Sequence, residues 1–176
     1  MESILKNSEF AKDYEKLKNV SLNPEKHFAK NAFEHTEMVA KRALELAELN
    51  NFSQEEKEII QNLAYVHDIG KILGTANPEK SLELLPKYGE FDKSFVNLVR
   101  HHDTNLPWHN SFMRGEAPSE KAWKKIAGKV NMKILCLFMI ADRADCPGGW
   151  KTNKPLNWFL DEAKKRRLID EELKTE

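Results

Sequence analysis

Histidine and aspartate side chains stand at positions where the surrounding sequence is apolar. His67 and Asp68 are adjacent at the end of an apolar helical stretch, in the string AYVHDIGK. His35 lies on the apolar face of an earlier predicted helix, and Asp142 interrupts the most hydrophobic segment of the chain. A buried carboxylate without a partner is strongly destabilising, so these groups need hydrogen-bond donors or a cation.

A divalent metal ion would satisfy all of these residues at once. Imidazole and carboxylate groups gathered from different helices are the ligands that such an ion requires in a helical bundle. The string His101-His102-Asp103 ends another predicted helix and adds further candidates. Taken alone, each residue is more typical of a hydrogen-bonded core position, but together they favour a metal site. Asp145, one turn beyond Asp142, is a rival ligand on spacing alone.

The elements that would position these residues are helices. Apolar residues recur at helical spacing and no alternating strand pattern appears, so we predict an all-α bundle of about six to seven helices. Ser53 and Glu56 form a capping box at the start of one helix, and Gly70 is its predicted stop. Residues 105–118 contain two prolines and a glycine, and we predict a loop that forms a lid or pocket wall. The predicted helices are 3–20, 28–49, 53–69, 78–85, 91–101, 119–145 and a last one from 156 into the charged tail.

Composition limits the class of protein. The chain has 176 residues, 28 Lys+Arg against 28 Asp+Glu, which argues against a polyanion-coating protein. We expect a single domain over 1–176 with a core at about 28–165, on which the helix 3–20 and the charged tail pack or fray. The longest apolar run is eight residues, too short for a membrane span, and no secretion signal is expected. Two cysteines without a paired motif suit a reducing cytoplasm.

The ordered pattern of His35, the doublet His67-Asp68, and Asp142 resembles the HD-domain metal-dependent phosphohydrolases, which are named for that adjacent pair. The resemblance covers roughly 32–144 and rests on the strings HTEMVAKRALELA, AYVHDIGKI, LVRHHD and MIADRAD. It implies an all-helical HD-domain bundle in which these four residues bind a divalent ion, with Mn²⁺ or Mg²⁺ favoured and Fe, Co, Ni or Zn as alternatives. The family string favours Asp142 over Asp145.

The resemblance also bears on the number of metal ions. Members that hold two metals usually add a histidine near the start of the helix after the doublet. Here that position falls at 77–79, where no histidine stands. We therefore expect one tightly bound ion, with a second recruited by His101 as the alternative.

Phosphate-ester hydrolysis assigns roles to the nearby residues. A divalent ion lowers the pKa of a bound water and polarises a phosphoryl oxygen. Lys71 and Arg143 are placed to meet the remaining phosphate oxygens. Asp68, His101 or His102 would deliver the proton to the leaving group, and the sequence leaves all three open.

Substrate selection is expected from residues 105–118. Trp108 is a candidate for stacking on a base, and Arg114 for binding a phosphate. We therefore expect a cytoplasmic phosphohydrolase of a nucleotide or related small phosphate ester, with monoesters and diesters both open. The alternatives are a nucleotide-sensing or partner-binding module without turnover, and an RNA-processing accessory phosphodiesterase. No RNA-binding module accompanies the bundle, so the case for nucleic acid is weak.

Overall fold

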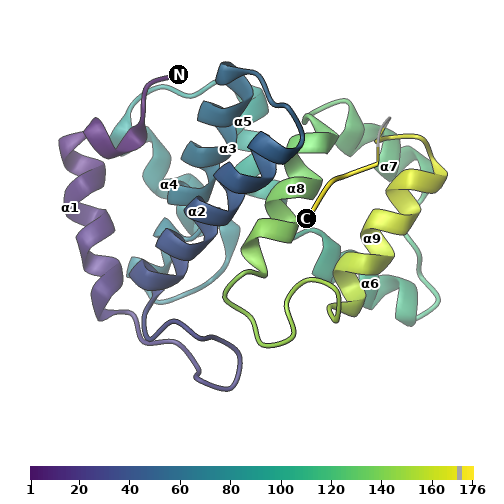
Figure 1. Cartoon of the computed structure of the whole chain (residues 1–176), viewed down its shortest axis with the longest axis horizontal. Coiled ribbons are helices and arrows are strands. Elements are labelled where there is room, and N and C mark those ends of the chain that lie inside the picture. The colour runs from purple at the N-terminus through teal and green to yellow at the C-terminus, as the bar shows by residue number, and fades with distance from the viewer. Residues whose placement is uncertain (170–171) are drawn as a thin grey trace.

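The computed structural model describes residues 1–169 and 172–176, and this part of the chain is built from helices (Figure 1). The predicted all-α class is confirmed, and the nine α-helices described slightly exceed the predicted six to seven. Three short 3₁₀ helices accompany them: η1 (Ile4–Lys6), η2 (Leu17–Asn19) and η3 (Ile69–Leu73). The α-helices are α1 (Ser8–Lys16), α2 (Ala32–Leu49), α3 (Gln54–Val66), α4 (Pro78–Tyr88), α5 (Lys93–His101), α6 (Asn105–Met113), α7 (Glu120–Ala127), α8 (Met132–Asp142) and α9 (Lys154–Lys165).

Helix α8 forms the centre of the bundle. Every residue of α8 except Lys133 is buried, as expected for a helix that is apolar on all sides. It packs against α2 and α3 on one side and α9 on the other, and Figure 1 shows it between these elements. Its last residue is Asp142, which therefore emerges at the end of the most buried helix in the molecule. None of the described helices is long and apolar enough to cross a membrane.

The helices that carry the candidate ligands begin at clear capping residues. Asn31 caps α2 by accepting a hydrogen bond from the Glu34 amide, so this helix begins at Ala32 and not at the predicted 28. The residues before it form a loop, closed by a single β-bridge between Ser21 and Asn31. The capping box predicted at Ser53 is confirmed at the start of α3.

The predicted helix over 119–145 is two helices. It ends first at Ala127, where Gly128 follows, and a new helix begins after Asn131. The Asn131 side chain accepts hydrogen bonds from two backbone amides of the next turn, which makes it a strong start signal. The apolar pattern continues across this junction, so the prediction of a single helix is wrong there.

The predicted loop over 105–118 is also incorrect, because α6 occupies 105–113. Pro107 lies in the first turn of α6. Backbone amides there have no acceptor within the helix, so a proline costs no helical hydrogen bond. Gly115, with φ of 79°, follows the end of the helix. Only the short connection to α7 remains irregular.

The predicted helix over 3–20 is α1 with η1 before it and η2 after it, and boundaries near Gly70 and Pro86 also differ from the prediction. Gly70 does not end a helix by a left-handed turn. It lies inside η3, and Gly74, with φ of 87°, ends that element. A methyl group on Gly70 would lie 2.4 Å from the Ser81 amide nitrogen, so its glycine allows α4 to approach closely. Helix α4 itself continues past Pro86 to Tyr88, with the proline in its final turn.

Candidate metal centre

The four predicted ligands converge from three places in the fold. His35 comes from α2, His67 and Asp68 from the end of α3, and Asp142 from the end of α8. Nε2 of His35 lies 3.1 Å from Oδ1 of Asp142 and 3.6 Å from Oδ2 of Asp68. Nε2 of His67 lies 3.4 Å and 3.3 Å from the same two oxygens. All four side chains are buried.

In both His35 and His67 the other ring nitrogen, Nδ1, already donates a hydrogen bond. Nδ1 of His67 donates to the backbone carbonyl of Ala64 at 2.7 Å, and Nδ1 of His35 donates to Asp145 at 2.8 Å. In its neutral form each imidazole carries one proton, here on Nδ1, so Nε2 would then present a lone pair toward the carboxylates. His67 Nε2 is fully buried and has no hydrogen-bond partner among the described residues. Two lone pairs facing two carboxylates are the donor set that a divalent cation fits.

The electrostatics of the cluster favour positive charge at its centre. Burial alone would lower the pKa of His67, but the charge of Asp68 and the contact with Asp142 raise it to about 10. Burial would raise the pKa of both carboxyls, yet their cationic neighbours hold each well below its usual range. The site therefore attracts a proton strongly, and a divalent ion would take that place.

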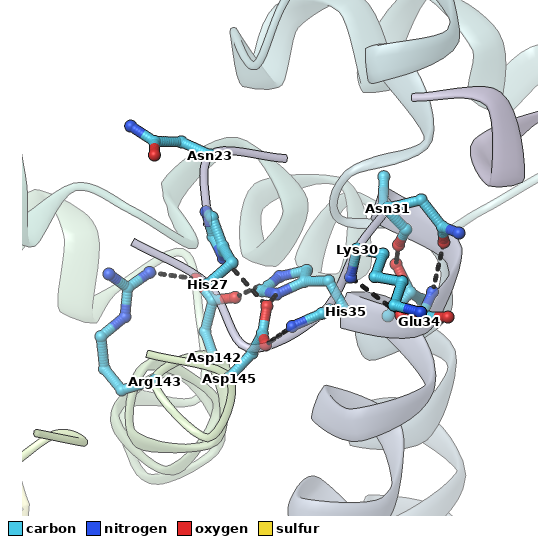
Figure 2. Close-up of polar contacts among 12 residues, drawn as sticks. Asn23, His27, Lys30, Asn31, Glu34, His35, Asp142, Arg143 and Asp145 are labelled. Carbon is cyan, nitrogen blue, oxygen red and sulfur yellow. Dashed lines mark hydrogen bonds and ion pairs between the residues drawn. The ribbon is translucent and has the colours of Figure 1, made fainter. Parts of the chain in front are cut away.

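Asp145, the rival ligand, lies behind His35 and not in front of it. The side chain is fully buried. Oδ2 accepts from Nδ1 of His35 at 2.8 Å and from Nδ1 of His27 at 2.9 Å, and Oδ1 accepts from the Ala29 amide at 2.6 Å (Figure 2). His27, His35 and Asp145 also lie close enough to hold an ion, but their facing atoms are satisfied by hydrogen bonds to one another. This geometry favours Asp142 as the ligand and gives Asp145 the role of orienting His35.

A cavity of about 230 Å³ opens in front of the cluster. His35, Asp68 and Asp142 line its inner end. Both predicted phosphate-binding cations lie there too. Nζ of Lys71 is 2.7 Å from Oδ2 of Asp68, and Nη2 of Arg143 is 2.8 Å from Oδ2 of Asp142. The inner end therefore combines two carboxylates with two cations that can donate hydrogen bonds.

Five other residues of the cavity wall have a different character. Three of them are apolar and two carry amide side chains, and they come from the segment after η3, the start of α6 and the start of α9. They are Ala76, Leu106, Pro155, Asn105 and Asn153. The sequence analysis named none of these residues, because their proximity depends on how α6 and α9 pack together.

The adjacent histidines at the end of α5, His101 and His102, have different surroundings. His102 is buried and lines the cavity, with its ring centroid 5.2 Å from that of His67. Its Nδ1 donates to the Val99 carbonyl at 2.7 Å, which leaves Nε2 as the acceptor. His101 is not among the described residues that line the cavity, and its Nδ1 lies 3.1 Å from the hydroxyl of Thr104.

Two predicted substrate-binding residues are not brought to the cavity. Trp108 packs edge-on against Trp123, with ring centroids 4.8 Å apart. Arg114 is exposed and donates to the hydroxyl of Ser111 at 3.2 Å. The reason is that 105–113 is helical, so its first residues meet the cavity while Trp108 turns toward the core.

His27 is a further cavity residue that was not predicted from the sequence. It lies in the irregular loop before α2, where no periodic pattern marks a functional position. The signal lies in three dimensions, in the hydrogen bonds that tie this loop to Asp145.

Comparison with known families identifies the region that carries the site. A family model described as HD domain matches residues 32–146, which is well over half of the chain. The match runs from the start of α2 to just beyond α8 and so includes all four converging side chains. Comparisons with the curated proteins and with the solved structures gave no match.

Proposed function

The chain belongs to the HD-domain family, and we propose that it is a metal-dependent phosphohydrolase acting on a nucleotide or related small phosphate ester. The observation that carries the proposal is the buried Nε2 of His67, which faces two carboxylates without a hydrogen-bond partner among the described residues. In a structural cluster a hydrogen-bond donor or a second ring proton would satisfy that atom. A metal site leaves it free for the ion.

His35, His67, Asp68 and Asp142 would hold one divalent ion, with Mn²⁺ or Mg²⁺ favoured and Fe, Co, Ni or Zn as alternatives. When bound, the ion would polarise a phosphoryl oxygen and make an attacking water more acidic. The cavity in front of the cluster gives the phosphate group access to this end of the site.

Lys71 and Arg143 would bind the phosphate. Each now pairs with a carboxylate of the cluster, at 2.7 Å and 2.8 Å. Once a divalent charge neutralises those carboxylates, their ion pairs with Lys71 and Arg143 become weaker. The two cations can then donate to phosphate oxygens. Charge-assisted hydrogen bonds of this kind are about twice as strong as neutral ones.

His102 is the favoured group for moving a proton. Its Nδ1–H is fixed by the Val99 carbonyl, so Nε2 is the atom that exchanges a proton in the cavity. Asp68 is a poor alternative, because its neighbours hold the pKa of its carboxyl well below the usual range and leave it without a proton to give. His101 is not among the described residues that line the cavity, so it is not favoured for this role.

Phosphate release tests the proposal. The protein would be stripped with chelator, reloaded with Mn²⁺, Mg²⁺, Co²⁺ or Ni²⁺, and assayed on nucleoside monophosphates, cyclic nucleotides and an aryl phosphate. We expect turnover with at least one ion and none in the stripped protein or in the Asp68→Ala variant. A protein that binds metal and these ligands without turnover would instead be a sensing module, and activity surviving Asp68→Ala would contradict the site.

A further inference from the structure

The loop before α2 is held against the end of α8 by one residue. Asp145 accepts three hydrogen bonds from consecutive loop residues. They are Nδ1 of His27 on Oδ2 at 2.9 Å, the Phe28 amide on the backbone carbonyl at 2.9 Å, and the Ala29 amide on Oδ1 at 2.6 Å. Figure 2 shows His27 beside Asp145 and His35. The loop position of His27 is therefore defined by the same carboxylate that orients a metal ligand.

This attachment decides what the His27 ring offers. Nδ1–H donates to Asp145, so Nε2 carries the lone pair and acts as an acceptor. The side chain is 20% exposed, and it lines the cavity. Asp145 thus holds His27 in one tautomer at the wall of the cavity.

An acceptor at this place differs from the two cations that would meet the phosphate. Lys71 and Arg143 only donate, and the oxygens of a phosphate group only accept when ionised. Nε2 of His27 therefore does not form a hydrogen bond with an ionised phosphate group, because both are acceptors. It fits a hydroxyl group on the organic part of the molecule.

We propose that His27 determines specificity by accepting a hydrogen bond at Nε2 from a substrate hydroxyl, so that the cavity prefers phosphate esters of sugars or other polyols. The inference rests on the proposed phosphohydrolase function and narrows its substrate class. The apolar part of the wall formed by Leu106 and Pro155 would then contact the rest of the ligand. Asp145 is a positioning residue in this scheme, because it acts through His27.

A matched pair of substrates and one variant test this. The metal-loaded protein would be assayed on adenosine 5′-monophosphate and its 2′,3′-dideoxy analogue, which differ only in sugar hydroxyls. His27→Asn keeps an N–H near the position of Nδ1, so it can still donate to Asp145, but it has no atom at the position of Nε2. We expect wild type to favour the hydroxylated substrate in kcat/KM by about threefold to tenfold, the range of one neutral hydrogen bond.

In the H27N variant that preference should vanish, because kcat/KM falls for the hydroxylated substrate and stays unchanged for the dideoxy one. His27→Gln, which restores an acceptor at similar reach, should recover part of it even where H27N folds poorly. Equal losses on both substrates would show that His27 only anchors the loop and would overturn the inference. Wild type that hydrolyses an aryl phosphate but shows no preference between the nucleotides would overturn it while leaving the phosphohydrolase proposal intact. No turnover of any phosphate ester would overturn both.

Discussion

Nε2 of His67 lies 3.4 Å from Oδ1 of Asp142 across a gap of 75 residues in the sequence, and no hydrogen bond joins them. The Ala64 carbonyl fixes the proton of this ring on the opposite nitrogen. The contact therefore brings a lone pair against a carboxylate, which is unfavourable unless a proton or a cation lies between them. This relationship is the basis of the proposed metal site.

Replacing the two cavity cations should weaken substrate binding without emptying the metal site. Lys71→Ala and Arg143→Ala each remove a charge-assisted hydrogen bond to phosphate. We expect kcat/KM to fall about 10- to 100-fold for each, mainly through KM, with metal content retained. Arg114→Ala is the matched control, because Arg114 is exposed and donates to Ser111. Equal losses in R114A would show that phosphate binds elsewhere.

Asp145→Asn should weaken metal binding even though Asp145 is not one of the four proposed ligands. The amide oxygen can replace only one of the two carboxylate oxygens, so either the two imidazoles on Oδ2 or the Ala29 amide on Oδ1 would meet an amide N–H instead of an acceptor. Loss of such an orienting partner typically reduces metal affinity about 10- to 100-fold. A metal titration of the variant would measure this change. A metal affinity equal to that of wild type would show that Asp145 does not orient His35 for metal binding.

The candidate metal ligands could be predicted from the sequence more completely than the residues of the substrate cavity. His35, His67, Asp68 and Asp142 are conspicuous because polar groups interrupt apolar helices, and that signal is local. The cavity wall depends on tertiary packing: Trp108 turns to the core, and His27 enters from a loop without periodicity. Helix class was predictable from spacing, while the boundary at 128–131 was not, because Asn131 starts a new helix within a continuous apolar pattern.

Gly70→Ala should destabilise the protein and disturb the residue beside Asp68. An added methyl group would lie 2.4 Å from the Ser81 nitrogen and 2.7 Å from the Lys80 carbonyl carbon, both backbone atoms. Overpacking of this kind lowers the free energy of unfolding by about 1–3 kcal/mol. Gly128→Ala is the control, because its nearest neighbour would be 3.4 Å away and its φ is −79°. Denaturant unfolding of both variants would test the difference, and similar stabilities would contradict it.

Asp13 should make stability depend on acid pH. Its side chain is 1% exposed and accepts hydrogen bonds from the hydroxyl of Tyr88 and from Nζ of Lys87 and Lys16. Burial opposes ionisation, but these bonds lower the pKa from 3.8 to about 2. The folded state therefore gains stability above the unfolded pKa, and loses it as pH falls from about 4 through about 2.

Asp13→Asn removes that gain. Because the lysine partners extend into solvent, we expect about 1–2 kcal/mol at pH 7 and a much smaller difference near pH 2. Urea unfolding of wild type and D13N at the two pH values would measure both. A destabilisation that is the same at pH 2 and pH 7 would show that the ionised form of Asp13 is not what stabilises the fold.

The most direct test of the metal centre is the metal content of the purified protein after incubation with Mn²⁺ and gel filtration. His67→Ala removes one donor of the cluster, while His101→Ala removes a histidine whose Nδ1 contacts Thr104 outside the cavity. We expect about one ion per chain in wild type and in H101A, and essentially none in H67A. A wild-type protein that retains no metal, or an H67A variant that retains as much as wild type, would contradict the assignment of this site.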